Sequence, residues 1–134
     1  MAIETGPMNR IEEVAASIVE AALEVRSEMG IGLLDEIYEL CLFQEFKNRG
    51  LRYKTHVVMP VKCDDLTIEE GYIIDILVED KVIVKIKPVG SKPSLYLAHV
   101  STYLKHSGLR LGILLDFDAK RLQNCVNRVT SYIL

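Results

Sequence analysis

One acid and two lysines with the spacing of a candidate catalytic or metal site lie in the segment GYIIDILVEDKVIVKIK, from Gly71 to Lys87. It is typical of two β-strands joined by a tight polar turn, with Asp75 in the first strand and Lys85 and Lys87 in the second. Side chains two residues apart share a strand face, so the two lysines do. A three-residue turn at 79–81 would set Asp75 opposite Lys85. A carboxylate there suits a divalent cation and lysines suit phosphate, but a plain cross-strand ion pair is an open alternative.

The elements that must position this segment follow from the hydrophobic pattern. We expect helices over residues 9–29, 33–49 and 95–107, and strands over 53–61, 66–78, 82–87 and 109–117. The segment 120–133 fits a helix or a strand, and both stay open. A three-stranded antiparallel meander, a crossover helix and a further strand predict an α/β fold, with a mixed sheet flanked by helices.

Bulk properties bound the class of protein. The chain has 134 residues, of which 49% are hydrophobic and 26% charged, so we expect one globular domain over 1–134 with a flexible segment 1–8. The N-terminus lacks the apolar stretch of a secretory signal, and no run approaches the roughly 18 apolar residues of a membrane span. Cys41, Cys63 and Cys125 are far apart, which disfavours a disulfide framework and predicts a cytoplasmic location.

Charge is distributed unevenly along the chain. Residues 1–80 carry 7 Lys/Arg and 17 Asp/Glu, a balance of 7 − 17 = −10, whereas 81–134 carry 9 and 2, a balance of +7. This asymmetry predicts a basic surface that can contact phosphates, or an acidic half that simply faces the basic half in the fold. The candidate phosphate contacts are Lys85, Lys87, Lys92, Lys105, His106 and Arg110.

Three motifs together resemble a known family. GIGLLDEIY, at Gly30–Tyr38, resembles the signature of the GxxExxY proteins, which are grouped with the PD-(D/E)xK nuclease superfamily. The likeness continues through residues 71–87 and through YLKHSGLRLGILLDF at 103–117, and it covers about 8–129. The resemblance implies a restriction-endonuclease-like core, dependence on Mg²⁺ or Mn²⁺, and DNA or RNA as the substrate. It also raises a homodimer as an alternative, because nucleases of this kind often work as dimers.

The resemblance implies a role for each matching polar residue. Asp35, in place of the family glutamate, and Asp75 would be catalytic metal ligands, and Lys87 would stabilise charge in the transition state. The glutamate of the E-x-K triplet falls on Lys85, which departs from the pattern. A lysine ammonium about 5 Å from a divalent ion costs roughly 6–7 kcal/mol at an effective dielectric of 20. We therefore expect Lys85 to pair with Asp75 where the metal would bind.

Four further residues are candidates for binding substrate. Tyr38 and Tyr103 match the family pattern, His99 stands where the family has glutamine, and Lys92 lies in the preceding loop. The structural alternatives are a half-buried packing role for the tyrosines and a hydrogen-bonded pair of His99 with Tyr103.

These observations favour a degenerate PD-(D/E)xK domain, related to nucleic acid, whose metal-dependent catalysis is impaired. The first alternative is an active Mg²⁺-dependent hydrolase in which Lys85 turns away or a nearby acid, such as Glu36 or Glu70, takes over its role. The second is a non-catalytic module that binds a protein partner. We expect no membrane association.

Overall fold

The computed structural model describes residues 7–131, and the side chains from residue 10 onward. Its helices are α1 (Pro7–Met29), α2 (Asp35–Asn48), α3 (Pro93–Ser107) and a short 3₁₀ helix η1 (Leu122–Asn124). Its strands are β1 (Tyr53–Cys63), β2 (Leu66–Val78), β3 (Val82–Ile86), β4 (Leu111–Leu115) and β5 (Val126–Thr130). None of the helices in this part of the chain is long and apolar enough to cross a membrane.

The strands form one sheet in the order β1-β2-β3-β4-β5. The pairs β1–β2, β2–β3 and β4–β5 are antiparallel, whereas β3 and β4 are parallel and are joined through α3. The expected meander, crossover helix and mixed sheet are therefore confirmed.

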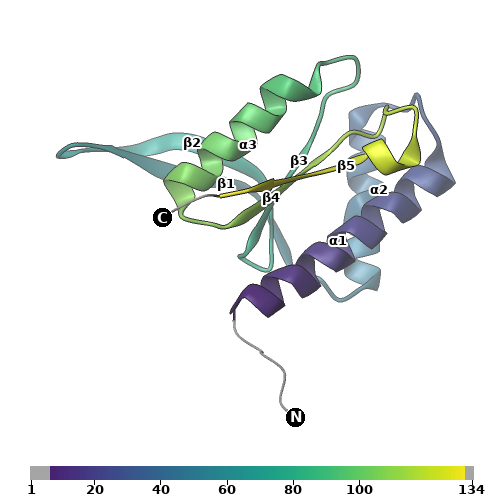
Figure 1. The fold of residues 1–134 in the computed structure, drawn as a ribbon, viewed down its shortest axis with the longest axis horizontal. Coiled ribbons are helices and arrows are strands. Elements are labelled where there is room, and N and C mark those ends of the chain that lie inside the picture. The colour runs from purple at the N-terminus through teal and green to yellow at the C-terminus, as the bar shows by residue number, and fades with distance from the viewer. Residues whose placement is uncertain (1–6, 132–134) are drawn as a thin grey trace, which may run out of the picture.

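Helices cover both faces of the sheet (Figure 1). α1 and α2 pack on one face through a cluster that includes Ile18, Leu42 and Val84, and α3 packs on the other face through Val100 and Leu104. β4 is buried along its whole length, as its continuous apolar run predicts for a strand covered on both sides.

Gly112 marks the closest approach of α3 to the sheet. A Cβ atom added to Gly112 would lie 2.3 Å from Cγ1 of Val100, which is fully buried. We expect Gly112→Ala to lower the free energy of unfolding by about 1–3 kcal/mol through overpacking, as measured by urea denaturation. Val100→Ala in the same chain makes room, so the double variant should lose less than the sum of the single losses. Simple additivity would show that this contact does not limit the packing.

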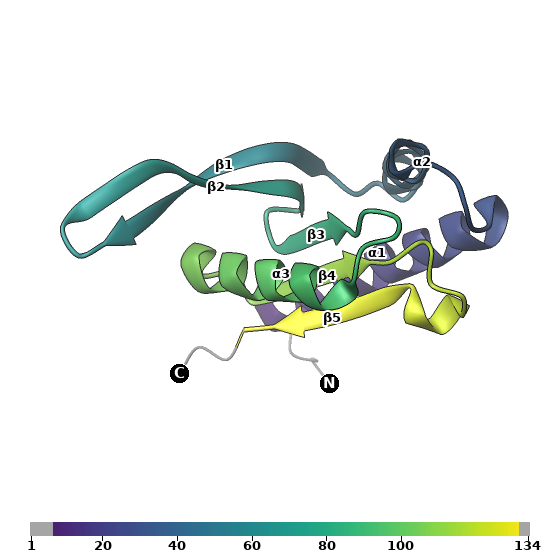
Figure 2. The same ribbon diagram turned by 90° about the horizontal axis from the view of Figure 1, so that it is seen from above.

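The β1–β2 hairpin extends well beyond the rest of the sheet (Figure 2). β1 continues through Pro60. Pro60 is tolerated because β1 is an edge strand, and the register shifts between Met59 and Val61.

Most of the expected elements differ from those in the structure by one or two residues at an end. β3 ends at Ile86, so Lys87 lies just beyond the strand. The segment 120–133, which was open, forms η1 and β5 within the described residues, and its last two residues lie outside them. Most of the segment expected to be flexible also lies outside, although α1 begins at Pro7.

Candidate functional site

Asp75 and Lys85 face each other across the β2–β3 hairpin. The antiparallel register pairs Ile76 with Val84, and Asp75 and Lys85 are the next residues along the two strands. Nζ of Lys85 lies 2.5 Å from Oδ2 of Asp75, and it also lies 5.7 Å from the centroid of the Tyr96 ring on α3. The expected cross-strand ion pair is therefore present, and a cation–π contact holds the ammonium group from a second side.

Lys87 has a different environment from Lys85. Its side chain is only 3% exposed, and Nζ lies 3.0 Å from Oδ1 of Asp118 and 3.5 Å from Oδ1 of Asp116. The same Nζ donates hydrogen bonds to the carbonyl oxygens of Ser91, at 2.7 Å, and Pro88, at 3.1 Å. Lys87 is therefore a buried cation that is held by carboxylate and carbonyl oxygens.

The two carboxyl groups around Lys87 differ in proton affinity. Burial raises the pKa of Asp116 to about 6, and a hydrogen bond from Asp116 lowers the pKa of Asp118 below its usual range. Asp116 is 8% exposed, and its Oδ1 has no hydrogen-bond partner among the described residues. Asp118 therefore stays ionised as the pH falls, whereas Asp116 takes up a proton below about pH 6.

The loop between β3 and α3 is fixed by these acids and by α2. The backbone N–H of Gly90 donates to Asp118, and that of Val89 donates to Oδ1 of Asp35, the first residue of α2. Gly90 has φ +82°, a conformation that favours glycine. Asp35 therefore positions the loop next to Lys87, in addition to any role at a ligand site.

An acidic pocket lies between α2 and the sheet. It is lined by Asp35, Glu36, Glu39, Asp75, Ile76 and Ile86. The two predicted ligands, Asp35 and Asp75, and one alternative acid, Glu36, thus line the same pocket. The other alternative, Glu70, does not line it. Sequence reasoning missed Glu39, although its position four residues after Asp35 puts both on one side of a helix.

The acidic pocket does not fit a divalent metal as it stands. In the described part of the chain, no three Asp, Glu, His or Cys side chains come close enough together to hold a metal ion. The Lys85 ammonium binds Asp75, the acid that such a metal would need. The chemistry available here is therefore cation binding by carboxylates in competition with an internal lysine.

Tyr38 is completely buried at the start of α2. Its ring stacks on Phe117 with a centroid distance of 4.7 Å. Its hydroxyl donates to the carbonyl oxygen of Gly30 at 2.6 Å and accepts from the backbone N–H of Leu33 at 3.2 Å. These contacts favour its structural alternative, and binding of substrate by Tyr38 stays a prediction.

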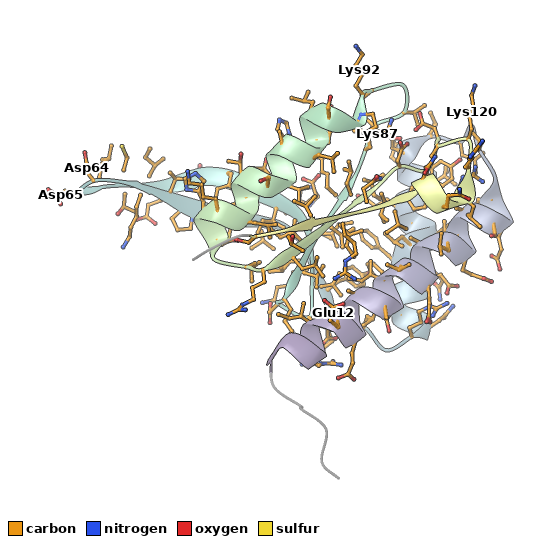
Figure 3. The ribbon with its side chains drawn as sticks, in the orientation of Figure 1. Glu12, Asp64, Asp65, Lys87, Lys92 and Lys120 are labelled. Carbon is orange, nitrogen blue, oxygen red and sulfur yellow. The ribbon has the colours of Figure 1, made fainter. Side chains whose placement is uncertain are left out.

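The other three predicted substrate-binding residues lie in α3 or directly before it. His99 lies between two aromatic rings, with centroid distances of 5.4 Å to Tyr96 and 6.3 Å to Tyr103. Tyr103 stacks on Tyr72 of β2 at 4.7 Å. Lys92 is the exposed residue before α3, and Figure 3 shows its side chain pointing away from the core. Their role with substrate stays a prediction.

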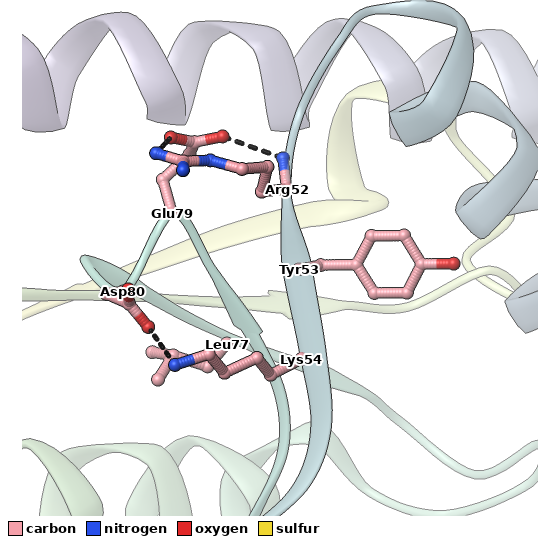
Figure 4. Close-up of a pocket in the computed structure, with 6 residues that line it drawn as sticks. All are labelled: Arg52, Tyr53, Lys54, Leu77, Glu79 and Asp80. Atoms are coloured by element: carbon pink, nitrogen blue, oxygen red, sulfur yellow. Dashed lines mark hydrogen bonds and ion pairs between the residues drawn. The ribbon is translucent and has the colours of Figure 1, made fainter.

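A second pocket lies at the base of the β1–β2 hairpin (Figure 4). Its charged groups pair with one another, since Arg52 binds Glu79 and Lys54 binds Asp80. The hydrogen bond from the Arg52 backbone N–H lowers the pKa of Glu79. These ion pairs tie the hairpin ends together, so the pocket is a structural junction.

The family of the chain follows from its sequence as a whole. The model of the PD-(D/E)XK nuclease superfamily matches residues 12–129, a range that includes every element from most of α1 to β5. Neither curated proteins nor solved structures gave a match to the chain. The mixed sheet and flanking helices agree with the restriction-endonuclease-like core that the family model requires. The chain therefore belongs to the PD-(D/E)XK nuclease superfamily.

Proposed function

We propose that this chain is a degenerate PD-(D/E)XK domain that binds nucleic acid and whose metal-dependent cleavage is impaired. The observation that carries the proposal is the ion pair between Lys85 and Asp75, at 2.5 Å. Lys85 stands at the position of the E-x-K glutamate, so a positive charge replaces a negative one beside the remaining aspartate. A divalent ion would have to displace that ammonium and then tolerate its charge.

The environment of Lys87 supports the same proposal. Its ammonium group is bound by Asp116, Asp118 and two carbonyl oxygens, so it has no donor left over for a phosphate. Contacts to phosphate would then fall to the exposed members of the predicted set, namely Lys92, Lys105, His106 and Arg110. Such contacts give affinity without sequence preference.

One observation favours the active hydrolase as a second candidate. If the Lys85 side chain turned outward, Asp75 would face a pocket that already contains Asp35, Glu36 and Glu39. Carboxylate oxygens are the ligands that Mg²⁺ prefers. The active form would therefore need Lys85 to turn away and the carboxylates of the pocket to move closer together.

A plasmid-nicking assay in Mg²⁺ and in Mn²⁺ separates the two candidates. We expect the wild-type protein to nick supercoiled DNA no faster than Asp75→Ala, because Asp75 is already neutralised by Lys85. Cleavage by the wild type that Asp75→Ala abolishes would overturn the impaired form and establish the hydrolase.

Binding is tested separately by fluorescence anisotropy with labelled single-stranded and double-stranded DNA and RNA. We expect affinity to fall steeply as salt rises from about 50 mM to about 200 mM, because bound phosphates release counterions. Lys105→Glu on α3 should weaken binding. Lys47→Glu, an exposed lysine on α2 across the sheet, is the matched control and should not. Absence of binding to every probe would favour the protein-interaction module.

A further inference from the structure

The surface formed by the end of α1, the loop after it and the outer side of α2 carries several exposed apolar side chains. Five of the large apolar residues that are exposed fall within this short stretch: Met29, Ile31, Leu34, Ile37 and Leu40. Leu34 and Leu40 are 68% and 64% exposed, the highest values for large apolar side chains in the described residues. Contiguous exposed apolar side chains of this kind mark interaction sites.

The spacing of three of these residues forms a stripe along the helix. Leu34, Ile37 and Leu40 follow one another at intervals of three, so their side chains neighbour one another on the side away from the sheet. The buried face of the same helix is formed by Tyr38, Leu42 and Phe46. We call Leu34, Ile37 and Leu40 the α2 stripe. Since the opposite face of α2 packs on the core, the α2 stripe has no partner within the described chain.

Uncompensated acids flank the α2 stripe. Glu36 and Glu39 line the acidic pocket with Asp35 and Asp75, and neither glutamate forms an ion pair with any described residue. Other glutamates on helices do form them, as Glu12 does with Arg128. The stripe and the pocket therefore make one continuous surface, apolar along its centre and negative along one side.

The charge of this surface selects among the occupants. A second copy packed antiparallel on the same surface would bring the glutamates along one side of each stripe against the identical glutamates of the other copy, which is unfavourable. Nucleic acid would be repelled. A basic amphipathic helix offers apolar anchors for the stripe and Lys or Arg side chains for the carboxylates.

We propose that the α2 stripe and its acidic flank form a docking site for a basic amphipathic helix of another protein. Apolar residues of that helix pack on Leu34, Ile37 and Leu40. Its cationic side chains reach the pocket at Glu36 and Glu39. The site lies across the sheet from α3, so it does not depend on the proposed binding of nucleic acid (Figure 1).

Two synthetic helical peptides of about 18 residues test the proposal with the full chain. Both carry the same leucine face, and the polar face is lysine in one and glutamate in the other. We expect the lysine peptide to bind in fluorescence anisotropy and the glutamate peptide not to bind. Leu40→Ser should lower the affinity for the lysine peptide by about tenfold or more. The double variant Glu36→Lys with Glu39→Lys should lower it to a similar extent.

The matched control is Asp64→Lys with Leu66→Ser at the tip of the β1–β2 hairpin, where an exposed leucine also stands beside exposed acids. This control variant should bind the lysine peptide as the wild type does. In both proteins, adding the lysine peptide should change the amide chemical shifts around residues 34–40. Equal loss in the control would show nonspecific attraction and overturn the proposal. A concentration-dependent dimer in sedimentation that Leu40→Ser dissociates would also overturn it, because the occupant would then be a second copy.

Discussion

Replacing Lys87 with methionine is expected to lower the free energy of unfolding by about 3–5 kcal/mol near pH 8, because removing one partner of a buried ion pair leaves an uncompensated charge. The side chain is 3% exposed and binds Asp116 and Asp118 together. Methionine nearly keeps the length of the side chain but supplies no hydrogen-bond donor for the carboxylates or for the carbonyl oxygens of Pro88 and Ser91. Chemical denaturation followed by circular dichroism measures the loss.

The cost of Lys87→Met should depend on pH. The pKa of Asp116 is about 6 in the folded protein, above its value of about 3.8 without the fold, so the folded state gains a proton. Stability that rests on this proton is present in acid and is lost as the pH rises from about 4 to about 6. Without the lysine the pKa of Asp116 rises further, so the variant should be less impaired near pH 5 than near pH 8.

Asp116→Asn in the Lys87→Met background provides the control, since it removes the charge and keeps the shape. It should recover much of the lost stability near pH 8. A Lys87→Met protein as stable as the wild type at every pH would show that Lys87 is not the cation that holds these loops.

Replacing Lys85 with glutamate is expected to tighten the binding of Mg²⁺ by about tenfold or more, measured by isothermal titration calorimetry. The change removes the ammonium from Asp75 and restores a second carboxylate beside it. The repulsion of roughly 6–7 kcal/mol estimated for an ammonium at about 5 Å is an upper bound, because a partly exposed lysine can turn away from an incoming ion. The gain in affinity should therefore be smaller than that figure implies.

Two variants separate the effect of position from that of charge. Lys85→Gln removes the positive charge alone and should give an intermediate gain. Lys54→Glu reverses the charge of an exposed lysine on β1 that pairs with Asp80, in the turn between β2 and β3. This variant should leave the affinity for Mg²⁺ unchanged. A wild type that already binds Mg²⁺ as tightly as Lys85→Glu would contradict the expected role of Lys85.

Local patterns were sufficient to predict the hairpin and its ion pair. A strand has a period of two, and a three-residue turn fixes the register, so Asp75 and Lys85 had to meet if the turn was placed correctly. The apolar face of α1 and the doubly buried β4 follow in the same way from residues near in sequence. The family likeness supplied Asp35, which no local pattern connects to Asp75.

The environment of Lys87 depends on contacts that are remote in sequence. Asp116 and Asp118 reach it only because β3 and β4 pair in parallel through α3, and the sequence does not give the register of that pairing. The shared face of Lys85 and Lys87 was a sound inference for a continuing strand. That inference does not apply to Lys87, because β3 ends one residue earlier, at Ile86.

The C-terminal segment shows a second limit. Its apolar residues fit both the helical and the strand period, so the neighbouring element determines which structure forms. Part of the segment forms β5 because it pairs with β4. Glu39 lies four residues after Asp35, and this spacing puts both side chains on one side of a helix. The spacing alone therefore predicts that Glu39 lies near Asp35.

The most direct test of the central claim is anomalous diffraction at the manganese edge from wild-type crystals soaked in Mn²⁺. We expect no anomalous peak at Asp75 and expect the Lys85 ammonium to remain against that carboxylate. A fully occupied Mn²⁺ ion coordinated by Asp75 and Asp35, with Lys85 turned away, would contradict an impaired metal site.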